Sequence, residues 1–493
     1  MDAQHPAPRI GLWGTFDLEE LDEVLFPRIA RRELGRRLPG ATVRTFAPFG
    51  PERGNRLDGG EPAEGLGSYG PERVAELSRE LDLVVVGPVD LAGDGDLAAR
   101  YGVDRDEVAR RAPGRFFVEG LGPELEAEVP VAWSAVAVPV DPSPQEAARY
   151  RDALPGRRVL SVRDEASRRR LEAAGVRVAV VPDPAVLASR LFTEDLLERR
   201  LEHLRALGWF PSAGLPLVVQ GDRSLLPLVE DLAASVASVA EHLGGVPVVL
   251  VEVAGGDGGF AAAMGQALPG PTQHAAGAGV EDVMAAIRTS AGLVCSSPRA
   301  GASAFAFGRP HVVLAPGPRS AAEGFARLID APESVVRGPG EVAAAFEKVA
   351  SLGPRPQVVR RVQIAVDEHL DAVARMAADA ARGRAPLRAP VASDRGARGR
   401  LEALQAAYEA RGRLLATQRW TFADRVRDAE ARERATRRRL EAETARLSAE
   451  VARLEAEVAG KDRELHTLLG TRTFRYTAGL RRAWGALRRL FRR

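Results

Sequence analysis

Cysteine and lysine are almost absent from this sequence. Cys295 is the only cysteine among 493 residues, so no internal disulfide can form, and its place in an apolar run favours a small core residue in a reducing compartment. Only Lys348 and Lys461 are lysines among 69 basic residues. We interpret this preference for arginine as codon usage in a GC-rich genome, so the abundance of arginine by itself indicates no function.

Long apolar runs are missing as well. No stretch reaches the roughly 18 apolar residues that span a bilayer, and the opening MDAQHPAPRIGLWG lacks the charged and apolar regions of a secretory signal. We therefore expect a cytoplasmic protein, and peripheral attachment to the inner face of the membrane stays open.

Charge is spread unevenly along the chain. The totals nearly cancel, with 69 basic and 67 acidic residues, but residues 383–493 hold 27 basic and 14 acidic residues, a net +13. Residues 1–382 therefore carry −11. An acidic body with a basic C-terminal segment directs that segment towards an anionic surface or polymer.

Short runs rich in Val, Ile and Leu alternate with helical patterns. They lie at 9–14, 42–48, 81–88, 129–139, 157–164 and 176–183, and after a predicted helix at 193–208 they resume at 215–222, 246–253, 291–297 and 311–316. Continuous apolar strands between helices indicate parallel sheets covered on both faces. We predict an α/β fold with two Rossmann-like domains, 8–190 and 191–353, and a closing helix at 354–382.

The ligand site of such a fold lies outside the carboxyl ends of its strands, in the cleft between the domains. The residues at those ends are Gly14 to Asp17, Arg163 and Asp164, Gln220 to Arg223, and Ser296 to Arg299. Asp164 is expected to cap a helix that begins at Glu165. Candidate substrate-binding residues are Arg163, Gln220, Asp222, Ser296, Ser297 and Arg299.

The C-terminal segment follows a different pattern. Residues 383–399 read as a linker, and 400–470 as a helical segment whose apolar spacing over 440–468 favours a self-associating coiled coil, with a single long helix as the alternative. Residues 471–493 hold eight arginines and no acid, with aromatic and leucine residues between them. Drawn as a helix, this tail suits an anionic membrane surface, while a disordered basic end is the alternative.

Four stretches together resemble the polysaccharide pyruvyl transferase family over about residues 9–350. They are GLWGTFDLEELDEVLFPRIARREL, LSVRDEASRRRLEAAGVRVAVVPDPAVL, VVQGDRSLLPLV and GLVCSSPRAGASAFAFGRPHVVLA, of which the second is the most specific. The resemblance implies a GT-B-like pair of Rossmann domains. It also implies transfer of the enolpyruvyl group of phosphoenolpyruvate to a sugar of a cell-surface polysaccharide or its lipid-linked precursor. The TFRYTAGLRR tail is similar to the ends of bacterial surface-glycan enzymes.

The donor that the resemblance implies carries a carboxylate and a phosphate, which arginines and helix N-terminal amides bind well. Arg163 matches the family's motif arginine. The sequence departs from the family where a histidine general acid is expected, because Ala300 stands there, and Glu20 to Glu23 place carboxylates in the first motif. His274, in a loop after the 246–253 strand, is the candidate to replace that histidine, and a solvent-exposed loop histidine without a catalytic role is the alternative.

Three functions stay open at this point. A pyruvyl transferase is the first, a non-catalytic relative acting as a glycan-assembly scaffold the second, and a nucleotide-sugar glycosyltransferase the third. No residue spacing indicates a metal site, and we expect no cofactor and no nucleic-acid partner.

Overall fold

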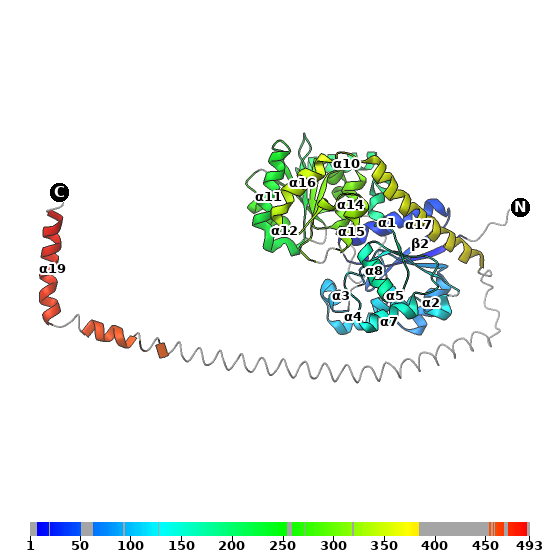
Figure 1. The fold of residues 1–493 in the computed structure, drawn as a ribbon, viewed down its shortest axis with the longest axis horizontal. Coiled ribbons are helices and arrows are strands. Elements are labelled where there is room, and N and C mark those ends of the chain that lie inside the picture. Colours follow the sequence, from blue (N-terminus) through cyan, green and yellow to red (C-terminus); the bar gives the residue numbers. More distant parts are fainter. Residues whose placement is uncertain are drawn as a thin grey trace. The chain divides into compact units, whose positions relative to one another are not determined.

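The computed structural model describes residues 7–18, 20–50, 63–91, 94–126, 128–253, 259–270, 272–317 and 320–383, together with 453–454, 457, 459–467 and 472–490. The chain divides into two units, Met1–Ala392 and Ser393–Arg493. The first unit is the body, and it contains both sheets (Figure 1).

The first sheet has seven parallel strands in the order β3-β2-β1-β4-β5-β6-β7. They are β1 (Arg9–Trp13), β2 (Thr42–Ala47), β3 (Glu64–Gly65), β4 (Leu83–Val86), β5 (Val131–Val136), β6 (Leu160–Val162) and β7 (Ala179–Val180). Every residue of β4 and β5 is buried, as expected for strands with helices on both faces.

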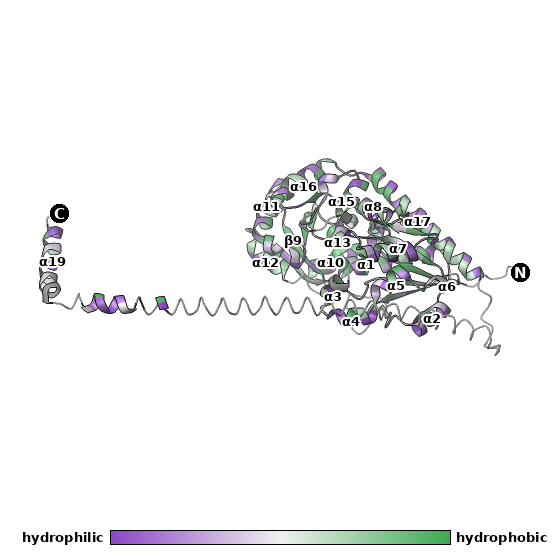
Figure 2. Cartoon of the chain, turned by 60° about the horizontal axis from the view of Figure 1, so that its bottom comes forward, coloured by the Kyte–Doolittle hydropathy of each residue, from purple (hydrophilic) through white to green (hydrophobic). Residues whose placement is uncertain are grey.

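The second sheet has six parallel strands in the order β10-β9-β8-β11-β12-β13. They are β8 (Leu217–Gln220), β9 (Val248–Val253), β10 (Thr272–Ala278), β11 (Gly292–Cys295), β12 (His311–Leu314) and β13 (Val335–Val336). The strand residues are mostly hydrophobic, whereas the outer helices carry both hydrophilic and hydrophobic residues (Figure 2).

Helices connect the strands in both halves. In the first half these are α1 (Leu21–Arg37), α2 (Pro71–Glu80), α3 (Asp94–Tyr101), α4 (Arg105–Arg111), α5 (Pro113–Glu119), α6 (Pro123–Glu126), α7 (Pro144–Ala153) and α8 (Glu165–Ala173). The 3₁₀ helix η2 (Pro184–Leu187) and α9 (Ala188–Leu191) lead to α10 (Glu194–Ala206) and the second half. There the helices are η3 (Arg223–Leu228), α11 (Val229–His242), α12 (Phe260–Ala267), α13 (Val280–Arg288), α14 (Pro298–Ala306), α15 (Ser320–Leu328), η4 (Pro332–Ser334), η5 (Pro339–Glu341) and α16 (Val342–Ser351).

Two helices pack against both halves of the body. On α1, Leu25 belongs to a core shared with the second sheet, while Phe26 belongs to a core under the first sheet. The long helix α17 (Pro356–Gly383) does the same, with Val366 in the first of these cores and Val373 in the second. Through α1 and α17, apolar packing therefore joins the two halves as well as the chain does.

Polar contacts fix α17 onto α1 and the first sheet. Arg37 on α1 is paired with Asp367 at 2.7 Å and Asp371 at 2.6 Å. Between these two aspartates on α17, His369 points to the first sheet, and its Nε2 lies 3.0 Å from the hydroxyl of Ser134 on β5. Burial lowers the pKa of His369 to about 4, so the folded protein holds this ring neutral.

The predicted fold class is confirmed, because all ten predicted strands lie in two parallel sheets with helices between them. The sequence reading missed β3, β10 and β13, which lie at sheet edges. The linker 383–399 and most of the coiled-coil region 400–470 lie outside the described residues; within the described part, 459–467 is helical. The tail forms the helix α19 (Arg472–Leu490). No helix among the described residues is both long and apolar enough to cross a bilayer.

Candidate functional site

The turn after β11 begins the helix α14. Ser297 caps it, because its side-chain oxygen accepts a hydrogen bond from the backbone N–H of Ala300 at 3.0 Å. Gln220, at the end of the adjacent strand β8, accepts from the backbone N–H of Ser297 at 3.3 Å. The hydroxyl of Ser296 is buried and has no hydrogen-bond partner among the residues that the structure describes. Three of the predicted residues thus lie together at the ends of two adjacent strands.

Arg299, in the first turn of α14, reaches across to the first half of the body. It is 4% exposed, its Nε donates to Asp183 at 3.0 Å, and its Nη2 donates to the backbone carbonyl of Pro88 just after β4. The guanidinium therefore lies where the strand ends of the two sheets face each other, which is where the sequence places the cleft.

Arg163 follows β6 and approaches the same place from the first sheet. Its Nη2 donates to Asp90, and its Nη1 lies 3.9 Å from Asp183. Asp183 also caps η2 by accepting from the backbone N–H of Ala185 at 3.0 Å. We call Asp90, Arg163, Asp183 and Arg299 the interdomain cluster.

Charges of alternating sign extend from the cluster along the first sheet. Arg100 on α3 donates to Glu20 at 2.9 Å and to Glu23 at 2.8 Å, and it interacts electrostatically with Asp90. Desolvation raises the pKa of Asp90, but the guanidiniums of Arg163, Arg100 and Arg299 outweigh it and hold the pKa below its usual value. Arg100 thus offsets part of the negative charge of Glu20 and Glu23.

His274 is not where the sequence places it. It lies within β10 and not in a loop, and its Nε2 is 3.0 Å from Glu252 Oε2 on β9. Strands β9 and β8 separate β10 from β11, so about 14 Å of sheet lies between His274 and the turn that carries Arg299. The error has a physical cause: TQHAAGA has few apolar residues because an edge strand is covered less completely.

The remaining predicted residues have structural partners. Asp164 caps α8 by accepting from the backbone N–H of Ser167 at 2.7 Å, as expected. Asp222 is exposed and caps η3 by accepting from the backbone N–H of Ser224 at 2.7 Å. Neither side chain reaches Arg163 or Arg299 through a contact in the described part of the body.

Asp17 closes the loop after β1. It accepts hydrogen bonds from the backbone N–H groups of Phe49 and Gly50, at 2.8 and 3.0 Å, and from the hydroxyl of Tyr101 at 2.7 Å. Burial raises the pKa of Asp17 in spite of these bonds. Because the carboxyl group ties three segments together, we assign it a structural role.

Aromatic rings fill the space above three strand ends. A Cβ at Gly14, after β1, would lie 2.4 Å from the ring of Phe16, and one at Gly87, after β4, would lie 2.6 Å from the ring of Phe26. After β8, a Cβ at Gly221 would lie 2.3 Å from the ring of Phe260. Glycine at such positions often admits a ligand close to the backbone, but here it admits the chain's own side chains.

The two halves also meet tightly at Gly324 on α15. A Cβ at this position would lie 2.5 Å from the Cβ of Asp164, the residue that caps α8 and directly follows Arg163. Glycine is therefore required for α15 to approach the first half this closely.

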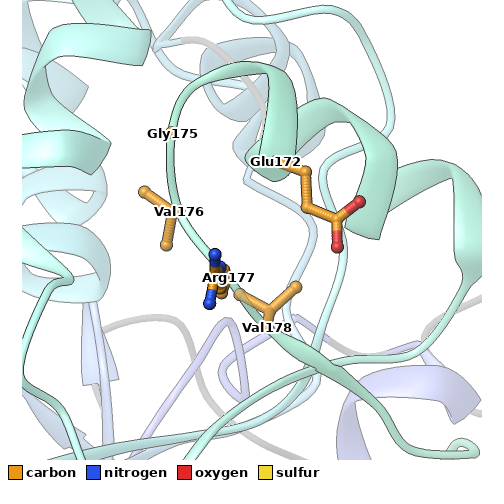
Figure 3. Close-up of a pocket in the computed structure, with 5 residues that line it drawn as sticks. All are labelled: Glu172, Gly175, Val176, Arg177 and Val178. Atoms are coloured by element: carbon orange, nitrogen blue, oxygen red, sulfur yellow. The ribbon is translucent and has the colours of Figure 1, made fainter.

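A further pocket lies at the other end of the first sheet. It is lined by Glu172, Gly175, Val176, Arg177 and Val178, in the turn between α8 and β7 (Figure 3). This turn precedes β7, so the pocket is at the amino end of the strands and away from the interdomain cluster. Ligands of parallel α/β sheets bind at the opposite ends, so we place the candidate site at the cluster.

Sequence reasoning missed Asp90, Asp183 and Arg100. Asp183 stands in the sequence Pro-Asp-Pro, which is typical of a turn; it caps η2, and it also accepts a hydrogen bond from Arg299. No local pattern marks Asp90 or Arg100, since each acquires its partner through the fold. The one available signal concerned Asp183, a carboxylate between two prolines close to the boundary between the domains.

Comparisons with known proteins find distant likeness only. No family model matches the sequence, and no curated protein matches it. Among solved structures, the chain is similar to UDP-GlcNAc 2-epimerase from Neisseria meningitidis (11% identity, 70% of this chain and 98% of that chain, TM-score 0.37). It is also similar to ADP-heptose LPS heptosyltransferase II of E. coli (13%, 70% and 99%, 0.36) and to UDP-GlcNAc 2-epimerase of Methanocaldococcus jannaschii (12%, 72% and 98%, 0.41). At these values the likeness assigns no activity or ligand to this chain.

Proposed function

We propose that the body binds an anionic donor at the interdomain cluster and acts on a glycan, as a pyruvyl transferase that uses phosphoenolpyruvate. One observation carries the proposal: Arg163 and Arg299, from the strand ends of different sheets, converge on Asp183. Paired guanidiniums recognise a carboxylate and a phosphate together, which are the two anionic groups of this donor.

The neighbouring turn supplies further hydrogen-bond donors to such a ligand. The N-terminus of α14 favours negative charge, and the partnerless hydroxyl of Ser296 lies beside it in the chain. Both guanidiniums already contact carboxylates, so Asp90 and Asp183 compete with a bound anion for the charge of the arginines. Donor binding is therefore a competition between anions, and the dianionic phosphate has the larger charge.

Formation of a ketal from phosphoenolpyruvate requires a group that supplies a proton to the enol carbon. Ala300 stands where the resemblance places a histidine, and His274 is three strand spacings from the turn. This favours one second candidate, a non-catalytic relative that serves as a scaffold in glycan assembly. The neutralised arginines and the rings above the strand ends support that candidate equally well.

Deletion and complementation in the source organism distinguish the two. A pyruvyl transferase predicts that the surface glycan of a deletion strain loses its pyruvate ketals. The wild-type chain should restore them, and Arg299→Ala should not. The control is Arg168→Ala, which should also restore them, because this half-exposed arginine pairs with residues of its own helix α8. Unchanged ketal content in the deletion strain rejects the transferase. Loss of the whole glycan, restored equally by Arg299→Ala, indicates the scaffold.

A further inference from the structure

The helix α19 holds large apolar side chains in contact with water. Tyr476 is 81% exposed, Leu480 71%, Trp484 70% and Leu487 52%. Exposed apolar residues are ordinary when scattered singly, but a row of four on one helix is not. Such a row indicates that these side chains bind to another surface, which then covers them.

The four side chains form one stripe. Their spacings of 4, 4 and 3 residues place them within an arc of about 80°, at 100° per residue. Arg481, Arg482, Arg488 and Arg489 fall on the other side, in an arc of about 120° to 240° from Tyr476. The helix is therefore amphipathic, with cations opposite to and flanking the apolar stripe.

We propose that α19 lies in the plane of an anionic bilayer surface and attaches the protein to it. Residues 471–493 contain eight arginines and no acidic residue, so the segment complements a surface of anionic lipid headgroups. The stripe enters the boundary between headgroups and acyl chains, where Trp and Tyr are favoured. Arg481 hydrogen-bonds to Thr477, on the flank of the stripe, and Arg482 hydrogen-bonds to the carbonyl of Ala478 on the opposite face.

Two other occupants fit the helix less well. A nucleic-acid backbone matches the arginines but gains nothing from Leu480 and Leu487. A second copy of α19 buries the stripe but brings two helices of the same charge together without acidic partners. The bilayer alone satisfies both sides of the helix, and this inference is independent of any activity of the body.

Vesicle co-sedimentation of the full chain tests the proposal. The probes are vesicles of phosphatidylcholine alone and of phosphatidylcholine with 30 in 100 phosphatidylglycerol, a composition on the order of natural anionic membranes. The charge variant is Arg488→Gln with Arg489→Gln, and the apolar variant is Leu480→Gln with Trp484→Gln. The matched control is Arg110→Gln with Arg327→Gln, two body arginines whose side chains are 63% and 62% exposed.

The wild-type chain and the control should bind the anionic vesicles and should release them at high salt. Each tail arginine removed should weaken binding about fivefold, and the apolar variant should weaken it at least about tenfold. The proposal is overturned if the wild-type chain does not bind anionic vesicles or if the control weakens binding as much as the tail variants. It is also overturned if the apolar variant binds normally, since the tail would then be a general polyanion binder.

Discussion

At the scale of single residues, Asp183 is the centre of the candidate site. It contacts Arg299 at 3.0 Å and Arg163 at 3.9 Å, and it caps η2. Sequence reasoning identified both arginines because they follow predicted strands, which is a local property. Their carboxylate partners depend on which strand ends face each other, and that is decided only by packing of the two halves.

Replacing Asp183 by Asn tests whether the arginines serve a ligand. The amide can still accept from the N–H of Ala185, but it no longer neutralises a guanidinium. We expect Asp183→Asn to raise the affinity for phosphoenolpyruvate about tenfold, because the donor no longer competes with that carboxylate. Titration calorimetry measures this. Asp141→Asn, at a side chain that is 90% exposed, is the control, and weaker binding by folded Asp183→Asn would contradict the expectation.

His369 predicts how stability depends on pH. Its pKa is about 4 in the folded protein and about 6.5 unfolded, so between these values only the unfolded chain takes up the proton. The free energy of unfolding should therefore be highest above pH 7 and fall towards pH 4. From pH 7 to pH 5 this one group contributes a loss of about 2 kcal/mol.

Urea unfolding of wild-type protein and His369→Gln at the two pH values measures this contribution. The variant should lose about 2 kcal/mol less than wild type between pH 7 and pH 5. Some loss remains in both proteins, because burial also lowers the pKa of His311 to about 4. An identical pH dependence in the two proteins would show that His369 is not buried neutral against Ser134.

At the scale of elements, the length of a strand and the extent of its burial explain whether the sequence could predict it. Strand β4 (LVVV) and the first four residues of β9 (VVLV) are buried valine and leucine, and their pattern is unambiguous. The missed strands β3 and β13 have two residues each, and β10 is an edge strand that holds His274 and exposed residues. The placement of His274 failed because its segment has loop-like composition yet pairs with β9.

The contact between α15 and α8 gives a prediction about packing. Gly324→Ala places a methyl group 2.5 Å from the Cβ of Asp164, so we expect a destabilisation of about 1–3 kcal/mol. Gly35→Ala is the matched control, since a Cβ there has nothing within 4 Å on the helix α1. That control should gain up to about 1 kcal/mol from helix propensity. Equal unfolding free energies for the two variants would show that α15 and α8 are not in close contact.

At the scale of the whole molecule, the acidic body and the basic tail present different kinds of surface. The body presents its candidate site where two sheets meet, and α1 and α17 join its halves through shared cores. The tail helix α19 presents arginines and an apolar stripe. The uneven charge was evident in the sequence, as was the α/β fold. The pairing of both candidate arginines with carboxylates was not evident in the sequence. Because of this pairing, only a binding experiment decides whether the arginines bind phosphoenolpyruvate.

Titration of the full chain with phosphoenolpyruvate, followed by calorimetry, tests the central claim most directly. The account predicts saturable binding by the wild-type chain and by Arg168→Ala, and its loss in Arg163→Ala and Arg299→Ala. Absence of binding at millimolar phosphoenolpyruvate, or equal binding by all four proteins, would contradict an anionic-donor site at the interdomain cluster and leave its arginines as ion pairs that join the two halves.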